Sequence, residues 1–196
     1  MAASSRSRFL DRSALAPGPE PALPKVFEYS MLHRTVFVYC PLMAEEVRRT
    51  MLQPGNRILA TRPGTVAGYC RFSLKEEPLP GALASGPSVR CDGLLLERLQ
   101  PSEMRAIDAF MNKSFDRIVV QVEAGNGFGG QETIEALMYV CPSEQLLDTN
   151  APWSYPEFRE QFLDTFLEKC ARPCREQFEL DEKALPPMPE EATTER

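Results

Sequence analysis

Apolar runs along the middle of the chain predict a series of buried strands. The first run, RTVFVYC, is too continuous for an exposed edge strand, in which apolar and polar residues would alternate. A glycine inside a strand indicates a bulge or a close approach of another backbone, and Gly93 has such a position. The strands predicted in this way cover residues 34–40, 65–74, 89–99, 116–124 and 132–141.

Two segments between these strands have the features of helices, and a third has those of a loop. Residues 44–52 predict a short helix, and residues 101–111 begin with proline and repeat apolar residues at spacings of three and four. The Pro- and Gly-rich segment 75–88 is expected to be a loop. This mixed order with short connections favours an α+β barrel-like sheet over a doubly wound fold.

The strongest helical pattern lies near the C-terminus, in residues 153–170. An apolar or aromatic residue recurs there at every fourth position, at Phe158, Phe162, Phe166 and Cys170. Such a stripe can dock a partner helix, but packing against the protein's own barrel is more common, and we expect it here.

The composition suits one globular domain with two tails. A chain of 196 residues, 43% of them hydrophobic, can bury a substantial core. We predict a disordered leader over 1–27, a folded domain over 28–175 that includes the C-terminal helix, and an acidic, Pro-rich tail over 176–196. The leader contains Arg and Ser, as transit peptides do, but Asp11, Glu20 and its prolines favour disorder.

Charge and hydropathy narrow the possible partners. The net charge of -6 argues against nucleic acid, which requires a basic face. No apolar run approaches the roughly 18 residues that a membrane span requires. We therefore expect a cytoplasmic protein that binds a small-molecule substrate and has neither nucleic-acid nor membrane partners. The pattern does not indicate an oligomeric state.

The cysteines and the glycine-rich segment predict no metal and no cofactor. Six cysteines without a secretory context do not indicate a disulfide framework, and His33 is too far from Cys170 and Cys174 to suggest a zinc site. The segment GNGFGG at 125–130 matches G-x-G-x-x-G. Strand-like residues follow it, whereas the dinucleotide fingerprint requires a helix, so a hairpin loop is the better interpretation.

Cys40, where the first strand turns into YCPL, is an obvious candidate nucleophile. A thiol needs a base or a positive environment to lower its pKa from about 8.5. His33 precedes it by seven residues, which is roughly 23 Å along one strand at about 3.3 Å per residue. A Cys/His dyad is therefore not expected.

Several motifs, in order and spacing, together resemble the γ-glutamylcyclotransferase-like family, in the branch of the plant avirulence-induced-gene proteins. The resemblance runs from about residue 35 to 166 and rests on VFVYCPLM, AGYCRFSL, LPG, CDGLLLERLQPSEMRAIDAF, EALMYV and WSYPEFREQFLDTF. It implies a small mixed β-barrel with flanking helices, a C-terminal helix, and a pocket at one mouth. It also implies cyclisation of a γ-glutamyl group, with release of 5-oxoproline and an amine.

In the family, a Tyr-Gly-(Ser/Thr)-Leu turn offers backbone N–H groups to the substrate, and a glutamate after an LDxF-type helix acts as general acid/base. Here Cys40 and Pro41 replace the glycine and the hydroxyl residue of the turn, and Met111 stands in place of the glutamate. Cysteine disfavours a positive φ, proline lacks an N–H, and a thioether cannot accept the proton. The positions that still match the family are Tyr39, Leu42, Gly68, Arg71, Asp108, Arg117 and Tyr139.

The catalytic residue is thus unassigned, with Asp108, Glu123 and Glu135 as candidate replacement acids, each of them more often part of a solvated face. The substrate-binding residues that the resemblance implies are Tyr39, Cys40, Pro41, Leu42, Met111 and Tyr139. Three functions follow, in this order. The first is an enzyme with an altered, more apolar pocket, acting in acyl transfer, cyclisation or isomerisation of a small metabolite. The others are a non-catalytic small-molecule-binding or interaction relative, and an ordinary cyclotransferase.

Overall fold

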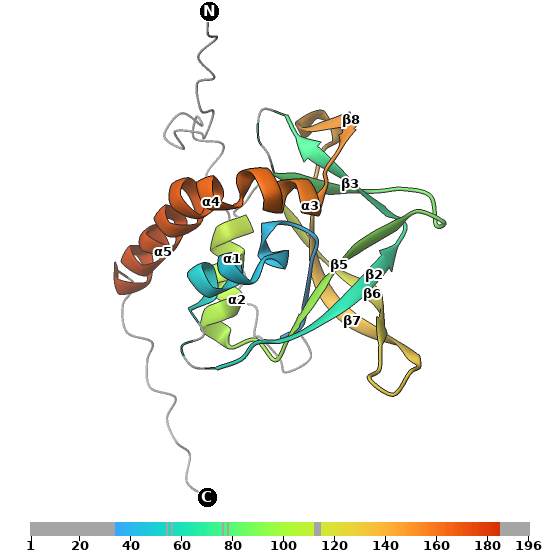
Figure 1. Cartoon of the computed structure of the whole chain (residues 1–196), viewed down its shortest axis with the longest axis horizontal. Coiled ribbons are helices and arrows are strands. Elements are labelled where there is room, and N and C mark those ends of the chain that lie inside the picture. The colour runs from blue at the N-terminus through green and yellow to red at the C-terminus, as the bar shows by residue number, and fades with distance from the viewer. Residues whose placement is uncertain are drawn as a thin grey trace, which may run out of the picture.

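The computed structural model describes residues 34–53, 55, 57–75, 77, 79–111 and 115–184. The predicted leader and the end of the predicted tail lie outside these residues. In the part described, a β-barrel is covered on one side by helices, and a second, smaller sheet lies beside it near the start of the C-terminal helical segment (Figure 1). The expected α+β barrel with flanking helices and a C-terminal helix is confirmed.

Five strands close the barrel in the order β1-β5-β2-β6-β7. β1 pairs antiparallel with β5 and parallel with β7, and this parallel pair closes the ring. The remaining neighbours are antiparallel. The strands are β1 (Val36–Val38), β2 (Ala60–Ala67), β5 (Arg90–Glu97), β6 (Asp116–Gly125) and β7 (Gln131–Val140).

Alternation along each strand decides which side chains fill the barrel. In β6, Val120, Val122 and Ala124 are buried, while Glu123 between them is exposed. Successive side chains of a strand point to opposite faces, so the three buried side chains point into the barrel and Glu123 points outward. Phe37 and Met138 belong to the same interior cluster. The barrel is therefore a packed core.

A second sheet of three strands has the order β4-β3-β8, with β3 at Tyr69–Leu74, β4 at Pro80–Ala84 and β8 at Leu147–Pro152. The single strand predicted over 65–74 is wrong, because Gly68, at a φ of 81°, breaks it into β2 and β3 in different sheets. The loop predicted over 75–88 is also wrong, since it contains β4. Pairing with β3 supplies the hydrogen bonds that a Pro- and Gly-rich pattern does not predict.

Two helices cover the side of the barrel formed by β1 and β7. The 3-10 turn η3 (Pro41–Met43) leads into α1 (Glu45–Leu52), and α2 (Pro101–Met111) packs beside α1. Glu103 fixes the start of α2, because its carboxylate accepts a hydrogen bond from the Gln100 N–H at 2.6 Å. Val36 and Val38 point toward these helices and belong to the same hydrophobic cluster as they do.

The C-terminal segment forms a long helical arm across α1 and α2 (Figure 1). It comprises α3 (Tyr155–Glu157), the π-helical η6 (Phe158–Phe162), α4 (Leu163–Phe166), the π-helical η7 (Leu167–Ala171) and α5 (Arg172–Ala184). Phe158 and Phe166 are fully buried, which confirms that the stripe packs on the protein itself. The helix continues past residue 175, where the domain was expected to end, and Phe178 is still buried.

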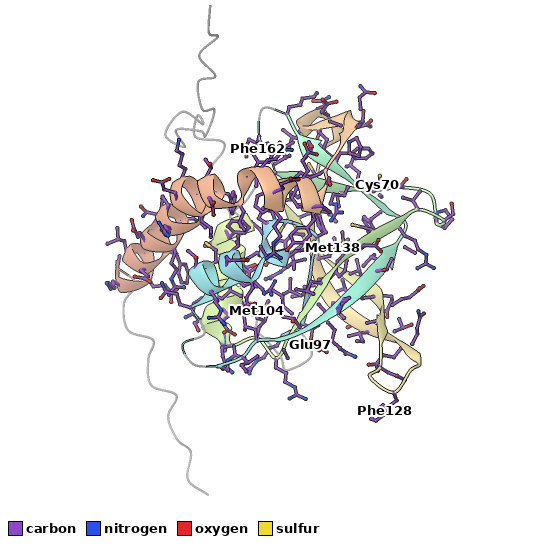
Figure 2. The ribbon with its side chains drawn as sticks, in the orientation of Figure 1. Cys70, Glu97, Met104, Phe128, Met138 and Phe162 are labelled. Atoms are coloured by element: carbon purple, nitrogen blue, oxygen red, sulfur yellow. The ribbon has the colours of Figure 1, made fainter. Side chains whose placement is uncertain are left out.

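The GNGFGG segment is the hairpin loop between β6 and β7, as expected. The Asn126 side-chain oxygen accepts hydrogen bonds from the Phe128 and Gly130 N–H groups, both at 3.0 Å, and holds the loop in one shape. Figure 2 shows Phe128 at the tip, where it is 96% exposed. The hairpin points away from the helices (Figure 1). A further 3-10 turn, η5 (Glu144–Leu146), precedes β8.

Of the helices in the described part of the chain, none is long and apolar enough to cross a membrane.

At Gly93 the backbone of β5 lies close against β1, as expected for a glycine within a strand. A Cβ atom there would lie 2.4 Å from the Val38 carbonyl oxygen and 2.5 Å from the Phe37 ring. We expect Gly93→Ala to lower the free energy of unfolding by about 1–3 kcal/mol or more, because a backbone oxygen cannot move aside. Guanidinium titration measures the loss.

Gly125→Ala is the matched control, because Gly125 also lies in a barrel strand and a Cβ there meets nothing within 4 Å. It should change the free energy of unfolding by less than about 0.5 kcal/mol. Equal losses in the two variants would contradict the close-approach explanation.

Candidate functional site

The turn that follows β1 accommodates both of its unusual residues without strain. Cys40 is extended, with φ -115° and ψ -170°, so the positive φ that would require glycine does not occur there. Pro41 occupies the first position of η3, where an N–H has no partner within the helix. The Met43 and Ala44 N–H groups donate to the Cys40 and Pro41 carbonyl oxygens at 2.8 and 2.9 Å. The turn therefore uses these N–H groups internally.

Two arginines hold the carbonyl groups of this turn. Arg71 on β3 donates to the Tyr39 carbonyl oxygen at 2.9 Å. Arg48 on α1 donates to the Leu42 and Met43 carbonyl oxygens at 2.9 and 2.6 Å. Burial lowers the pKa of Arg48, and Tyr155 and nearby glutamates oppose that shift. Neither arginine was predicted to bind the substrate, although Arg71 matches the family pattern.

The Tyr39 side chain lies inside the barrel. Its hydroxyl donates to the Tyr139 carbonyl oxygen at 2.6 Å and accepts from the Ala82 N–H at 3.1 Å. It thereby links β7 to β4, and burial raises the pKa of its phenol well above the usual value. The structure thus gives the Tyr39 side chain a structural role in the core.

The other predicted ligand-binding residues are also buried. Cys40, Leu42, Met111 and Tyr139 belong to one hydrophobic cluster between the barrel and the helices, and Pro41 is buried beside them in sequence. Met111, at the position of the family glutamate, is 6% exposed. Apolar side chains therefore fill the place where the resemblance implies a cradle and a proton acceptor.

Burial makes the Cys40 thiol a poor nucleophile. It raises the pKa of Cys40 to about 11, although backbone hydrogen bonds and the charge of Arg71 act in the opposite direction. Burial likewise raises the pKa of Cys91 to about 11. At neutral pH both thiols are protonated, and the thiolate is the nucleophilic form.

One polar cluster lies at the edge of this apolar region. The Asp108 carboxylate on α2 accepts hydrogen bonds from the Tyr139 hydroxyl and from Arg117, whose Nη1 lies 3.0 and 3.1 Å from its two oxygens. The Asp108 side chain is 34% exposed. Burial, followed by the charge of Asp108, raises the pKa of Tyr139, so the phenol remains a donor. These residues come from α2, β6 and β7.

The structure brings only one of the three candidate acids to this cluster. Glu123 lies on the outer face of β6, where it pairs with Arg90 at 2.7 Å and its side chain is 44% exposed. Glu135 is exposed on the outer face of β7, opposite Gln121. Both match the solvated-face alternative.

Trp153 was also missed from the sequence, and it is buried between Arg71 and the C-terminal arm. The Arg71 guanidinium carbon lies 5.0 Å from the centre of the Trp153 ring, a cation–π distance. Trp153 is the single tryptophan of the chain and the first residue of the WSYPEFREQFLDTF motif, and these were its signals in the sequence.

All six cysteines are free thiols. Within the described ranges, no group of three or more His, Cys, Asp or Glu side chains is arranged to hold a metal ion.

The closed five-stranded barrel, the flanking helices and the C-terminal helix are the class of fold that the motifs implied. Residues 36–157 match the family described as γ-glutamyl cyclotransferase, AIG2-like. This match covers more than half of the chain, so the protein belongs to that family.

Individual relatives agree with this assignment. AIG2-like protein D of Arabidopsis thaliana is 29% identical over 133 residues, which are 68% of this chain and 84% of that protein. Protein AIG2 C of the same plant is 25% identical over 135 residues, covering 67% and 78% of the two chains. The solution structure of an Arabidopsis thaliana protein superposes with a TM-score of 0.51 at 22% identity, over 77% of this chain and 85% of that one. This last likeness shows the fold alone.

The raised pKa of Cys40 predicts slow alkylation in the folded protein. At pH 8 a thiol with a pKa of about 11 is ionised in about one molecule per thousand. We expect iodoacetamide to label Cys40 at least about tenfold more slowly than the half-buried Cys70, and the rate to rise with pH toward 11. Peptide mapping by mass spectrometry measures both sites in one sample. Equal labelling rates at pH 8 would contradict the proposed burial of the thiol.

The Asp108 cluster predicts a loss of stability when its carboxylate is removed. Asp108→Asn removes the ion pair between Asp108 and Arg117 and weakens the Tyr139 hydrogen bond, so we expect a loss of about 1–3 kcal/mol. Glu123→Gln is the control, because an exposed ion pair contributes at most about 1 kcal/mol. Urea unfolding of both variants measures the difference, and an equal effect would show that Asp108 is only a surface residue.

Proposed function

We propose that this family member does not catalyse γ-glutamyl cyclotransfer and that it acts as a non-catalytic small-molecule-binding protein. The observation that supports this is the burial of Cys40 and Met111 in one apolar cluster, at the positions of the family's cradle and glutamate. The location we propose is cytoplasmic, in keeping with six free thiols.

The cyclotransfer reaction needs a group that accepts a proton, and the buried apolar residues at the site do not provide one. The α-ammonium of a γ-glutamyl substrate, with a pKa near 8, must lose a proton before its nitrogen attacks the γ-carbonyl. Met111 cannot accept that proton, and Cys40 is itself protonated at neutral pH. The Asp108 oxygens already accept from Tyr139 and Arg117. Loss of a general base alone lowers a rate by about 100- to 10,000-fold.

An enzyme with an altered pocket is the second candidate, and the hydrogen bond between the partly exposed Asp108 carboxylate and the buried Tyr139 hydroxyl favours it. A carboxylate beside a protonated phenol is a general base next to a hydrogen-bond donor, which suits cyclisation or isomerisation of a small metabolite. If this candidate is right, Asp108→Asn should abolish turnover of a substrate that the variant still binds.

The proposal is tested by measuring 5-oxoproline after incubation with γ-glutamyl amino acids and γ-glutamyl amines. We expect a rate at least about 100-fold below that of an active cyclotransferase assayed in parallel. Turnover comparable to the active enzyme would refute the proposal.

The combined variant Cys40→Gly, Pro41→Ser, Met111→Glu tests whether these three residues are the cause. A gain of 5-oxoproline release would show that the scaffold is competent and that only the site was altered. Met111→Glu alone, which keeps the filled turn, is the matched control and should gain less.

A further inference from the structure

The Arg71 guanidinium makes its hydrogen bonds to the described residues through Nη1 alone. Its Nη1 donates to the Tyr39 and Asp92 carbonyl oxygens at 2.9 and 3.2 Å and lies 3.7 Å from the Met43 sulfur. Its Nε and Nη2 have no acceptor among the described residues, and neither belongs to the buried polar atoms that lack a partner. These two donors therefore reach solvent.

The charge of Arg71 is also without a counter-ion among the described residues, in contrast to two arginines of the barrel strands. Arg62 pairs with Glu97 and Glu132, and Arg117 pairs with Asp108. Within the part of the chain that the structure describes, no carboxylate pairs with Arg71, since Asp92 offers it only a backbone oxygen. The Asp92 carboxylate instead accepts from the Thr65 hydroxyl at 2.8 Å.

Aromatic and apolar groups surround this cation. The Trp153 ring lies 5.0 Å from the guanidinium carbon, and the half-buried Tyr155 ring lies 6.4 Å from the Trp153 ring. Met43 is also half-buried, and its sulfur lies 3.7 Å from the Arg71 Nη1. The stacking on Trp153 and the two backbone acceptors hold the guanidinium in one orientation, so little side-chain entropy is lost when a ligand binds.

We propose that Arg71 binds a small organic carboxylate through its free Nε and Nη2 edge. The Nε–H and one Nη2–H lie parallel, which matches the two oxygens of a carboxylate. A single cation beside aromatic and thioether groups suits a monoanion with an apolar body better than a phosphate, which takes more donors. The inference rests on the proposed binding function, because it names the ligand class for the same end of the barrel as the Tyr39–Met43 turn.

Trp153 makes the proposal directly measurable, because it is the only tryptophan and it contacts Arg71. The probes are phenylacetate and hexanoate, each compared with its neutral amide, in a titration of tryptophan fluorescence. A carboxylate that neutralises the guanidinium changes the charge over the indole ring. We expect a saturable change with the acids and none with the amides.

Arg71→Gln should weaken phenylacetate binding at least tenfold, and Arg71→Lys, which keeps the charge without the fork, should be intermediate. Arg90→Gln is the control, because Arg90 is an exposed arginine paired with Glu123 on the barrel wall, and it should bind as the unaltered protein does. Thermal unfolding checks that each variant is folded. The Nε–H resonance of Arg71 in the unaltered protein gives a second readout that needs no variant.

Three results would overturn the proposal. They are no saturable response to either acid, an equal response to acid and amide, or an Arg71→Gln variant that binds as tightly as the unaltered protein. None of them bears on 5-oxoproline release, so failure of the carboxylate site is distinct from failure of the proposed loss of cyclotransfer.

Discussion

The insertion of β1 between β5 and β7 is the constraint on which the rest of the structure depends. This strand has only three residues, yet it closes the barrel through an antiparallel pair on one side and a parallel pair on the other. Phe37 fills the barrel, while Val36 and Val38 anchor the helices on the outside. The turn at 39–43 has to leave the barrel where β1 ends, so the position of the candidate site follows from this closure.

The candidate site is filled by buried apolar side chains and offers few unpaired polar groups to a ligand. A cradle made of backbone N–H groups needs a ligand or water to complete its hydrogen bonds. Here the turn is closed on itself, its carbonyl groups are held by Arg48 and Arg71, and apolar side chains lie where the family has its proton acceptor. The polar groups that remain are at the edges, in the Asp108 cluster and at Arg71. A chain can thus keep the barrel of its family while the residues at its mouth differ from the family pattern.

The sequence predicted more of the fold than of the site. The helices at 44–52 and 101–111 and the hairpin around GNGFGG were predicted because their hydrogen bonds and spacing are local. The strand β4 was missed, because Pro80 and Gly81 resemble a loop until β3 lies beside them. At the site, the sequence alone showed that methionine stands at position 111, where the resemblance implies a glutamate. The extended conformation of Cys40 could not be predicted in this way. Glycine in relatives does not imply a positive φ in this chain.

By itself, the sequence determined the family, the class of fold and the residue types at the turn and at the end of α2. These features follow from the order and spacing of motifs along the sequence. Tertiary structure alone decided that Arg71 lies on Trp153, that Tyr39 points into the barrel, and that Asp108 rather than Glu123 meets Tyr139. These contacts join residues up to 100 positions apart, and a hydrogen bond or a stacked cation requires atoms within a few ångströms of each other. Only closure of the barrel brings them that close.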